Sequence, residues 1–147
     1  MKEIHQPNPS KEQVAQMLIH RILRKGKRNL AQRIFDRTME EIQAATGSDP
    51  QDVLQQAIQN VTPKTEVKSK RVRGSTYQVP KEVSSERGLT LGLRWLLQAA
   101  KQRPERGMIR QLAAEIIAAS DRRGNAIRKC DEIHRMAEAN RAYAHLK

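Results

Sequence analysis

The stretch from Pro63 to Pro80, PKTEVKSKRVRGSTYQVP, decides the fold expected for this chain. Two runs rich in Thr, Val and Tyr meet at Arg73-Gly74, which predicts a β-hairpin with a tight turn in which Gly74 takes a positive φ. Neither predicted strand has a cleanly apolar face, and a single hairpin without partner strands has nowhere to bury one. We therefore expect the hairpin to stand out from a larger body as a basic arm over residues 63–83.

The flanks of the arm have helical periodicity. Apolar residues recur at three-to-four spacing and predict six helices, three on each side of the arm. A capping box at Ser10 to Gln13 and the pair Asp49-Pro50 mark two helix starts, and Gly26 is expected to follow the last turn of the first helix. The remaining helices are predicted over about 29–45, 85–102, 106–120 and 125–140.

The fold class is therefore mainly α, a six-helix bundle-like domain with one protruding basic β-hairpin between the third and fourth helices. We expect a single domain over residues 1–147, with a flexible tail at 1–9.

The composition is strongly basic. With 28 Lys and Arg against 16 Asp and Glu, the net charge is +12 and the pI is about 10.4. A charge of this size indicates a polyanionic partner, either a nucleic acid or an anionic surface. Basic membrane helices usually carry Trp or Phe at the apolar edge, and no apolar run here approaches about 18 residues. A membrane partner is therefore not expected.

One cysteine is present. Cys130 excludes an intramolecular disulfide and fits a reducing compartment, and the first residues lack the apolar centre of a secretory signal. Cys130 and His134 would share a helix face, which leaves a metal half-site or an activated thiol open. No second ligand pair and no glycine-rich phosphate loop accompany them. We therefore expect no enzyme activity, no metal and no cofactor, with Cys130 packed against the bundle and His134 hydrogen-bonded at a surface.

The cations gather at turns, on the arm and along the last helix. Cations suit a helix C-terminus, but four within the five positions 24–28 exceed what a cap requires. We predict contacts with nucleic-acid phosphates from these clusters: Arg24, Lys25, Lys27 and Arg28; Lys64, Lys68, Lys70, Arg71 and Arg73 with Tyr77; Arg122 and Arg123; Arg128, Lys129, Arg135 and Arg141.

DNA and RNA are harder to separate. A helical body with a basic arm also describes DNA-bending proteins, but their arms commonly place an apolar wedge or a proline at the tip. Here the tip is Val72-Arg73-Gly74-Ser75. RNA modules that stack bases on aromatic side chains need more aromatics than Phe35, Tyr77, Trp95 and Tyr143 provide. Folded RNA, bound by shape through phosphate contacts, fits best, with an architectural DNA-binding protein as the alternative.

Three segments resemble one family. VKSKRVRGSTYQVP at 67–80, LGLRWLL at 91–97 and HRMAEANRAYAH at 134–145 are similar, in this order, to signatures of the bacterial-type small-subunit ribosomal protein seven family. The resemblance covers about residues 10–147. It implies a structural constituent of the small ribosomal subunit that binds the 3′ major domain of the rRNA, nucleates head assembly and lies near the exit-site tRNA. Neighbouring ribosomal proteins are implied partners, and some members also bind their own mRNA.

The resemblance also assigns roles to residues. It implies rRNA contacts at Lys68, Lys70, Arg71 and Arg73, with Tyr77 and Gln78 shaping the hairpin. Arg94 would face RNA and Trp95 the body of the fold, and the segment 134–145 would approach the exit site.

Three features depart from the family's pattern. The N-terminal extension before the first helix is shorter, Arg73 replaces a glycine of the hairpin tip, and Cys130 stands where a basic residue is usual. A non-glycine residue at positive φ costs about 1 kcal/mol. The segment 126–145 resembles plastid and cyanobacterial members most closely. We expect a place in the head of the small subunit, in the bacterial cytoplasm or in a plastid or mitochondrion.

Overall fold

The structure, a computed structural model, describes residues 9–23 and 26–146. In chain order it contains α1 (Lys11–Ile22), α2 (Arg28–Thr46), α3 (Pro50–Val61), β1 (Thr65–Val72), β2 (Ser75–Glu82), α4 (Ser85–Lys101), α5 (Met108–Ser120), α6 (Asn125–Ala139) and a 3₁₀-helix, η1 (Arg141–Leu146). The mainly α fold with one hairpin between the third and fourth helices is confirmed. The 3₁₀-helix η1 was not predicted. Most of the tail predicted at 1–9 lies outside the described residues.

Local capping signals place the helix starts where the sequence predicts them. Ser10 and Gln13 form a reciprocal capping box, with the Gln13 amide donating to Ser10 Oγ at 3.2 Å and the Ser10 amide donating to Gln13 Oε1 at 2.9 Å. Asp49 caps α3 by accepting the Gln51 amide at 3.0 Å, and Pro50 is the first helical residue.

The end predicted for the first helix is wrong. Its last residue is Ile22 and its C-cap is Leu23, so Gly26, although left-handed with a φ of 71°, lies beyond the helix end. The apolar face ends close to this point: Ile22 is buried in the core, Leu23 packs against it partly buried, and the sequence from 24 to 28 contains no further apolar side chain. Gly26 instead turns the chain into α2.

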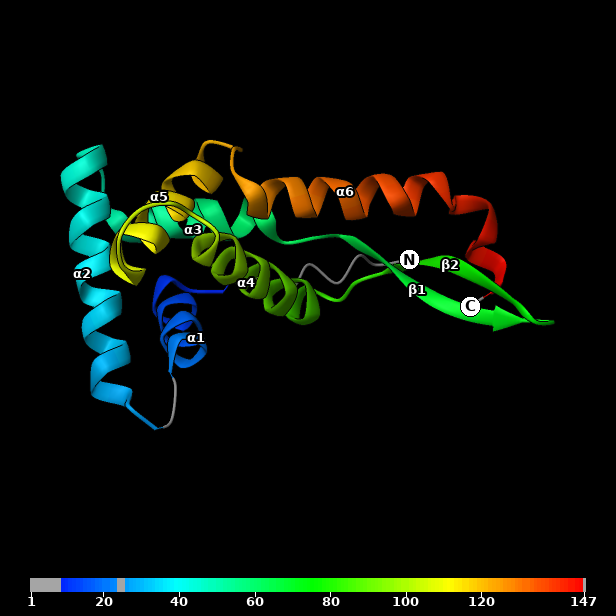
Figure 1. Ribbon diagram of the computed structural model, residues 1–147, viewed down its shortest axis with the longest axis horizontal. Coiled ribbons are helices and arrows are strands. Elements are labelled where there is room, and N and C mark those ends of the chain that lie inside the picture. The colour runs from blue at the N-terminus through cyan, green and yellow to red at the C-terminus, as the bar shows by residue number, and fades with distance from the viewer. Residues whose placement is uncertain (1–8, 24–25, 147) are drawn as a thin grey trace.

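The core is aliphatic and lies among α1 to α5. Its fully buried side chains come from all five helices, and α5 contacts α2, α3 and α4. The largest of them are Leu18, Ile42, Leu54, Leu93, Leu96, Leu112 and Ile116, all between 0 and 1% exposed. We call α1 to α5 with the first turns of α6 the body (Figure 1).

Two glycines let α4 cross close to the end of α3 and the start of the hairpin. A Cβ at Gly92 would lie 3.1 Å from the carbonyl oxygen of Val61, and one at Gly88 would lie 2.8 Å from that of Pro63. A Cβ would clash with the backbone at Gly88 and would crowd it at Gly92, so glycine eases this close approach of helix and backbone. This crossing fixes the direction in which the hairpin leaves the body.

The hairpin has the predicted two-residue turn. Pairing runs from Thr65↔Glu82 to Val72↔Ser75 and leaves Arg73 and Gly74 as the loop, with φ values of 50° and 83°. Two left-handed residues in succession match the type I′ turn that suits the twist of paired strands. The predicted strain at Arg73 is therefore present in the fold.

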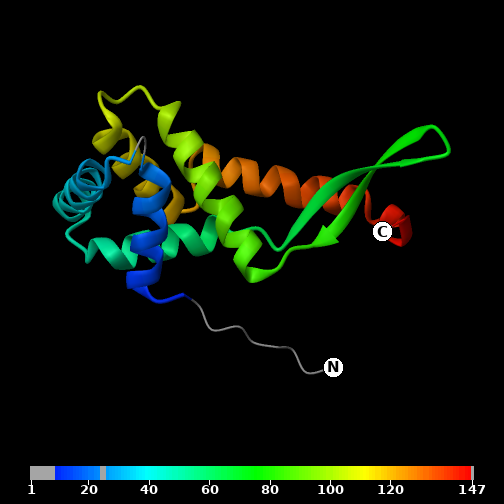
Figure 2. The ribbon, with the colours of Figure 1, turned by 90° about the horizontal axis from the view of Figure 1, so that it is seen from below.

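The hairpin does not stand alone. The second half of α6 runs alongside it, and η1 packs against β2 (Figure 1). Seen from below, the turn still reaches farther from the body than η1 does (Figure 2). We call β1, β2, η1 and the second half of α6 the finger. Over the residues described, no helix is both long and apolar enough to cross a membrane.

Candidate nucleic-acid interface

Polar contacts fix the base of the finger to the body. The Arg87 guanidinium of α4 binds the Glu66 carboxylate of β1 in two-point geometry, at 3.0 and 3.2 Å. The Lys64 amide donates to His134 Nε2 of α6 at 3.0 Å, which orients α6 along β1. The two-point geometry of an arginine with a carboxylate restricts rotation as well as distance. The hairpin is thus set at one angle to the body.

The C-terminal 3₁₀-helix covers part of the hairpin. The rings of Tyr77 in β2 and Tyr143 in η1 are 5.1 Å apart and tilted by 50°, and the Lys70 ammonium donates to the Leu146 carbonyl. Aromatic pairs in this geometry add stability beyond their buried area. Tyr77 therefore has a packing role in the finger, and its predicted RNA contact stays a prediction.

Three lysines converge on the hairpin. Lys68, Lys70 and Lys81, with Ser69 and Val79, line a cleft of about 260 Å³ that contains no acidic residue. Lys81 was missed from the sequence. The signal was available, because the turn at Arg73-Gly74 pairs residue 66 with 81 and 68 with 79, which places all three lysines on one face. Such a cleft suits a phosphate group.

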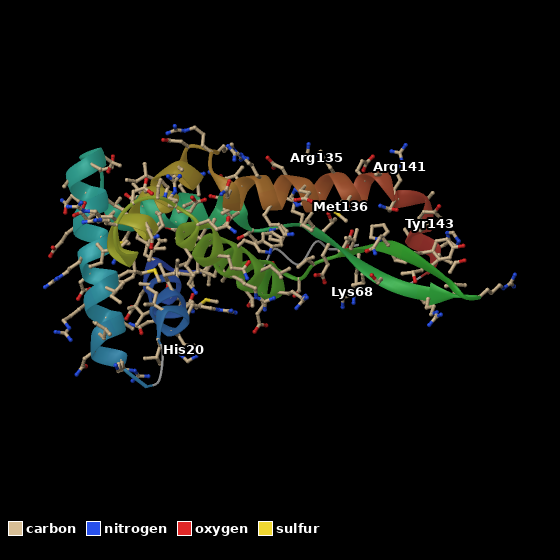
Figure 3. The ribbon with its side chains drawn as sticks, in the orientation of Figure 1. His20, Lys68, Arg135, Met136, Arg141 and Tyr143 are labelled. Carbon is tan, nitrogen blue, oxygen red and sulfur yellow. The ribbon has the colours of Figure 1, made fainter. Side chains whose placement is uncertain are left out.

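The cations of the finger point to different sides. Figure 3 shows Arg135 and Arg141 directed away from the hairpin, whereas Lys68 lies on the side of the hairpin away from α6. Arg141 also pairs with Glu138 at 2.7 Å, but both side chains are more than 70% exposed, so this pair adds little stability. The finger therefore presents basic groups on two opposite faces.

At the start of α2 the cations oppose the helix dipole. Lys27 is the N-cap residue and forms no side-chain capping bond, Arg28 follows it, and the first turn of α2 contains no acidic residue. Cations are stabilising at a helix C-terminus and unfavourable at an N-terminus. Because α1 already ends at Ile22, capping explains neither Lys27 nor Arg28. This position at a helix N-terminus suits an external anion. Arg24 and Lys25 lie outside the described residues.

A buried carboxylate holds the second basic turn, residues 121–124. Glu115, 1% exposed, accepts from Arg103 Nε at 2.7 Å and from the Ala126 amide at 3.0 Å, and so joins α5 to the start of α6. A Cβ at Gly124 would come within 2.7 Å of Glu115 Oε1, so only glycine fits there. This contact leaves Arg122 and Arg123 exposed at the turn, with Arg123 paired to Asp121 at 3.2 Å.

A polar groove of about 340 Å³ lies between α4 and α6. Arg128 and Lys129 stand on its α6 side, and Trp95 and Gln98 on its α4 side. Trp95 is buried and so faces the body of the fold as predicted, and Arg94 is exposed. That Arg94 contacts RNA remains a prediction.

Cys130 and His134 have structural roles. Cys130 packs with Leu91 and Trp95 between α4 and α6, and burial raises the pKa of its thiol to about 11. His134 accepts the Lys64 amide, as predicted for a hydrogen-bonded surface histidine. Within the described ranges no group of three or more His, Cys, Asp or Glu side chains is arranged to hold a metal ion. A thiol with a raised pKa is a poor nucleophile.

The predicted residues form separate clusters. Lys68 and Lys70 share the hairpin cleft, and Arg128 and Lys129 share the groove beside α4. The start of α2 and the turn at 121–124 lie on opposite sides of the body (Figure 1). Lys64, Arg71 and Arg73 are exposed along the hairpin. The cations among residues 9–23 and 26–146 do not share one groove, so they suit a partner that surrounds the protein.

Comparison with known proteins identifies the family. A model described as ribosomal protein S7p/S5e matches residues 1–141. The chain belongs to this family. Small ribosomal subunit protein uS7c of Ostreococcus tauri is 50% identical over 142 residues, 96% of this chain and 91% of that protein. Small ribosomal subunit protein uS7 of Synechococcus sp. (strain JA-3-3Ab) is 52% identical over 131 residues, 89% of this chain and 84% of that protein.

The relative from Nostoc punctiforme, also named uS7, is 51% identical over the same shares of the two chains. Membership in the S7p/S5e family gives this chain a structural role in the ribosome and not that of an enzyme. The family predicted from the hairpin and the two later signatures is confirmed.

Proposed function

We propose that this chain binds the 3′ major domain of small-subunit rRNA and nucleates assembly of the subunit head. Its family and its relatives, which are named as small-subunit proteins of cyanobacterial or plastid type, support a place in a bacterial or plastid small subunit. The net charge of +12 supports a polyanionic partner.

One observation carries the RNA contact. Lys27 and Arg28 begin a 19-residue helix whose first turn contains no acidic residue, and Lys27 makes no side-chain capping bond. Both cations are exposed, and the helix dipole makes their position unfavourable in the free protein. An rRNA phosphate at this point would pair with the two cations and lie at the positive end of the helix dipole.

The other cations extend the grip in several directions. We assign rRNA phosphate contacts to Lys68, Lys70, Arg71, Arg73 and Lys81 on the finger, and to Arg122, Arg123, Arg128 and Lys129 at and after the turn before α6. Lys64, Tyr77, Arg94, Arg24 and Lys25 remain candidates of the same kind. Folded RNA that wraps the protein can reach clusters on opposite sides of the body, which a straight duplex cannot.

The far side of the finger suits a second partner. Arg135 and Arg141 point away from the hairpin (Figure 3), within the segment 134–145. We assign this face to the exit-site tRNA and to neighbouring ribosomal proteins, and leave binding of the chain's own mRNA as an additional role of the rRNA-binding surface.

Footprinting tests the proposal. The purified protein is incubated with small-subunit rRNA, and backbone cleavage is mapped with and without it, while duplex DNA competes at fixed salt. We expect protection concentrated in the 3′ major domain that excess duplex DNA does not remove. Absence of protection in the 3′ major domain would contradict the proposal. Loss of that protection to duplex DNA would favour an architectural DNA-binding protein instead.

A further inference from the structure

Two arginines have a backbone conformation that most residues avoid. Over residues 9–23 and 26–146, the positive φ values belong to five glycines and to Arg73 and Arg122, with φ of 50° and 57°. In the left-handed region Cβ crowds the following carbonyl oxygen, and only glycine, with asparagine and aspartate to a lesser degree, enters it readily. Both arginines are therefore strained.

At Arg73 the turn type imposes the strain. Val72 pairs with Ser75, so Arg73 and Gly74 form the whole loop and both need a positive φ. Asn-Gly and Gly-Gly are the pairs that fit a type I′ turn best. Arginine is a poor choice for the turn itself.

At Arg122 the end of α5 imposes the left-handed conformation. The Arg122 amide donates to the Ala119 carbonyl at 3.1 Å and the Arg123 amide donates to that of Ala118 at 2.7 Å, with Asp121 as the C-cap of α5. These two bonds define a Schellman motif in which Arg122 holds the left-handed position, the one that glycine usually occupies.

The same chain uses glycine where no basic turn is involved. The end of α2 is also left-handed, and there Gly47, with a φ of 69°, donates its amide to the Gln43 carbonyl at 2.8 Å. A Cβ at Gly47 would meet nothing within 4 Å, so space does not decide the choice of residue at such a position. Arg73 and Arg122 both stand in clusters of exposed cations, where Gly26 and Gly74 show that glycine can also fill a left-handed position.

No hydrogen bond or ion pair with a described residue compensates for the strain at either arginine. Both side chains are exposed, and neither guanidinium forms a hydrogen bond or an ion pair with any residue that the structure describes. Their neighbours Arg71 and Arg123 are exposed cations as well. Strained residues persist where the strained conformation serves a function.

We propose that Arg73 and Arg122 lower folding stability and raise RNA affinity: each holds its guanidinium against an RNA phosphate at the apex of a basic turn. The inference rests on the proposed rRNA binding and names two residues within it. It requires that stability rises and RNA affinity falls when either arginine is replaced by asparagine.

Asparagine at each position separates the two effects. Arg73→Asn and Arg122→Asn remove the charge and relax the backbone, so we expect each to raise Tm by about 2–4 °C. Binding to a transcript of the 3′ major domain should weaken about fivefold near 0.15 M salt, and the salt slope should flatten by about one unit per variant. Thermal melts and a salt titration of the dissociation constant measure both.

Two kinds of control make the result specific. Arg73→Lys and Arg122→Lys keep charge and strain, and should leave Tm and slope near those of the natural chain. Arg123→Asn removes a neighbouring cation without a left-handed backbone, and should flatten the slope without raising Tm.

Each contrary outcome has its own meaning. A Tm that stays level or falls in both asparagine variants would contradict the claim that the left-handed backbone costs stability. An unchanged salt slope with a raised Tm would contradict the claim that the guanidinium binds a phosphate. If the unaltered protein does not bind the transcript, the proposed function fails and this inference fails with it.

Discussion

The body and the finger are held together by different kinds of contact. In the body, aliphatic side chains from five helices are buried together to 0–9% exposure. The finger has a short hairpin, one aromatic pair, one buried valine, Val79, and polar bonds at its base. Burial of apolar area dominates folding free energy, so the body supplies the stability of the protein.

Charged side chains are distributed differently between body and finger. The body buries its apolar residues and carries exposed cations at two turns and along its helices, as at Arg33, Arg37 and Arg110, whereas the finger carries cations on two opposite faces. A surface that binds RNA must stay exposed and charged, and it therefore cannot contribute a core of its own. Within the finger the hairpin gains its order from α6 and η1, because a hairpin alone would be marginal in water. This difference between body and finger predicts that substitutions in the two regions have effects of different kinds.

The largest effect on stability is expected in the core. Leu96 of α4 is 0% exposed, and Leu96→Ala should lower the free energy of unfolding by about 2–5 kcal/mol. Urea denaturation followed by circular dichroism measures the decrease. A cost below about 1 kcal/mol would show that the body is not the source of stability assumed here.

Cys130 sits where body and finger meet, and its thiol makes stability depend on pH. Burial raises its pKa from 9.0 to about 11, so the folded state favours the neutral thiol. The contribution is complete below pH 9 and is lost as the pH rises through 11, by about 2–3 kcal/mol. Comparison with Cys130→Ala between pH 8 and 11 cancels the titration of lysines and tyrosines. Parallel curves for the two proteins would contradict the prediction.

The buried carboxylate of Glu115 is expected to matter next. Glu115→Gln weakens its bonds to Arg103 and to the Ala126 amide, and should cost about 1–3 kcal/mol. Glu105 also pairs with Arg103, at 3.4 Å, but is 34% exposed, so Glu105→Gln should cost less than about 1 kcal/mol. Thermal unfolding of the two variants compares them. Equal costs would mean that Glu115 does not hold α6 in place.

The smallest effect is expected in the finger. Tyr143→Ala removes the ring that packs on Tyr77 and should cost about 0.5–1.5 kcal/mol, felt by the finger alone. Amide hydrogen exchange should speed up by up to about tenfold in β2 and stay unchanged in α5. Tyr143→Phe keeps the ring and should exchange like the natural chain. Equal acceleration in α5 would mean that finger and body open as one unit.

The sequence predicts what depends on neighbouring residues. The capping box at Ser10, the cap at Asp49 and the turn at Arg73-Gly74 are set by contacts within a few positions, and each appears in the structure. The end of α1 was misplaced because the helix ends with its apolar face, at Ile22 with Leu23 as the C-cap, and not at the glycine signal of Gly26.

Long-range contacts account for what the sequence does not show. Glu115 reads as a surface residue of a helix, and only its contacts with Arg103 and Ala126 explain its burial. The packing of Tyr77 on Tyr143 likewise joins positions 66 residues apart. The left-handed helix end at Arg122 has no glycine at that position, which is the usual sequence signal. The place of Lys81 beside Lys68 and Lys70, in contrast, could be predicted once the register of the hairpin was fixed.

The salt dependence of RNA binding tests the division between body and finger most directly. The variant Lys68→Ala, Lys70→Ala, Arg71→Ala, Arg73→Ala is compared with the natural chain for binding to the 3′ major domain of rRNA and for urea stability. We predict a salt slope flatter by about three to four units, roughly one for each phosphate that the variant no longer neutralises, with less than about 1–2 kcal/mol change in stability. An unchanged slope would contradict this division and assign the finger to a protein partner.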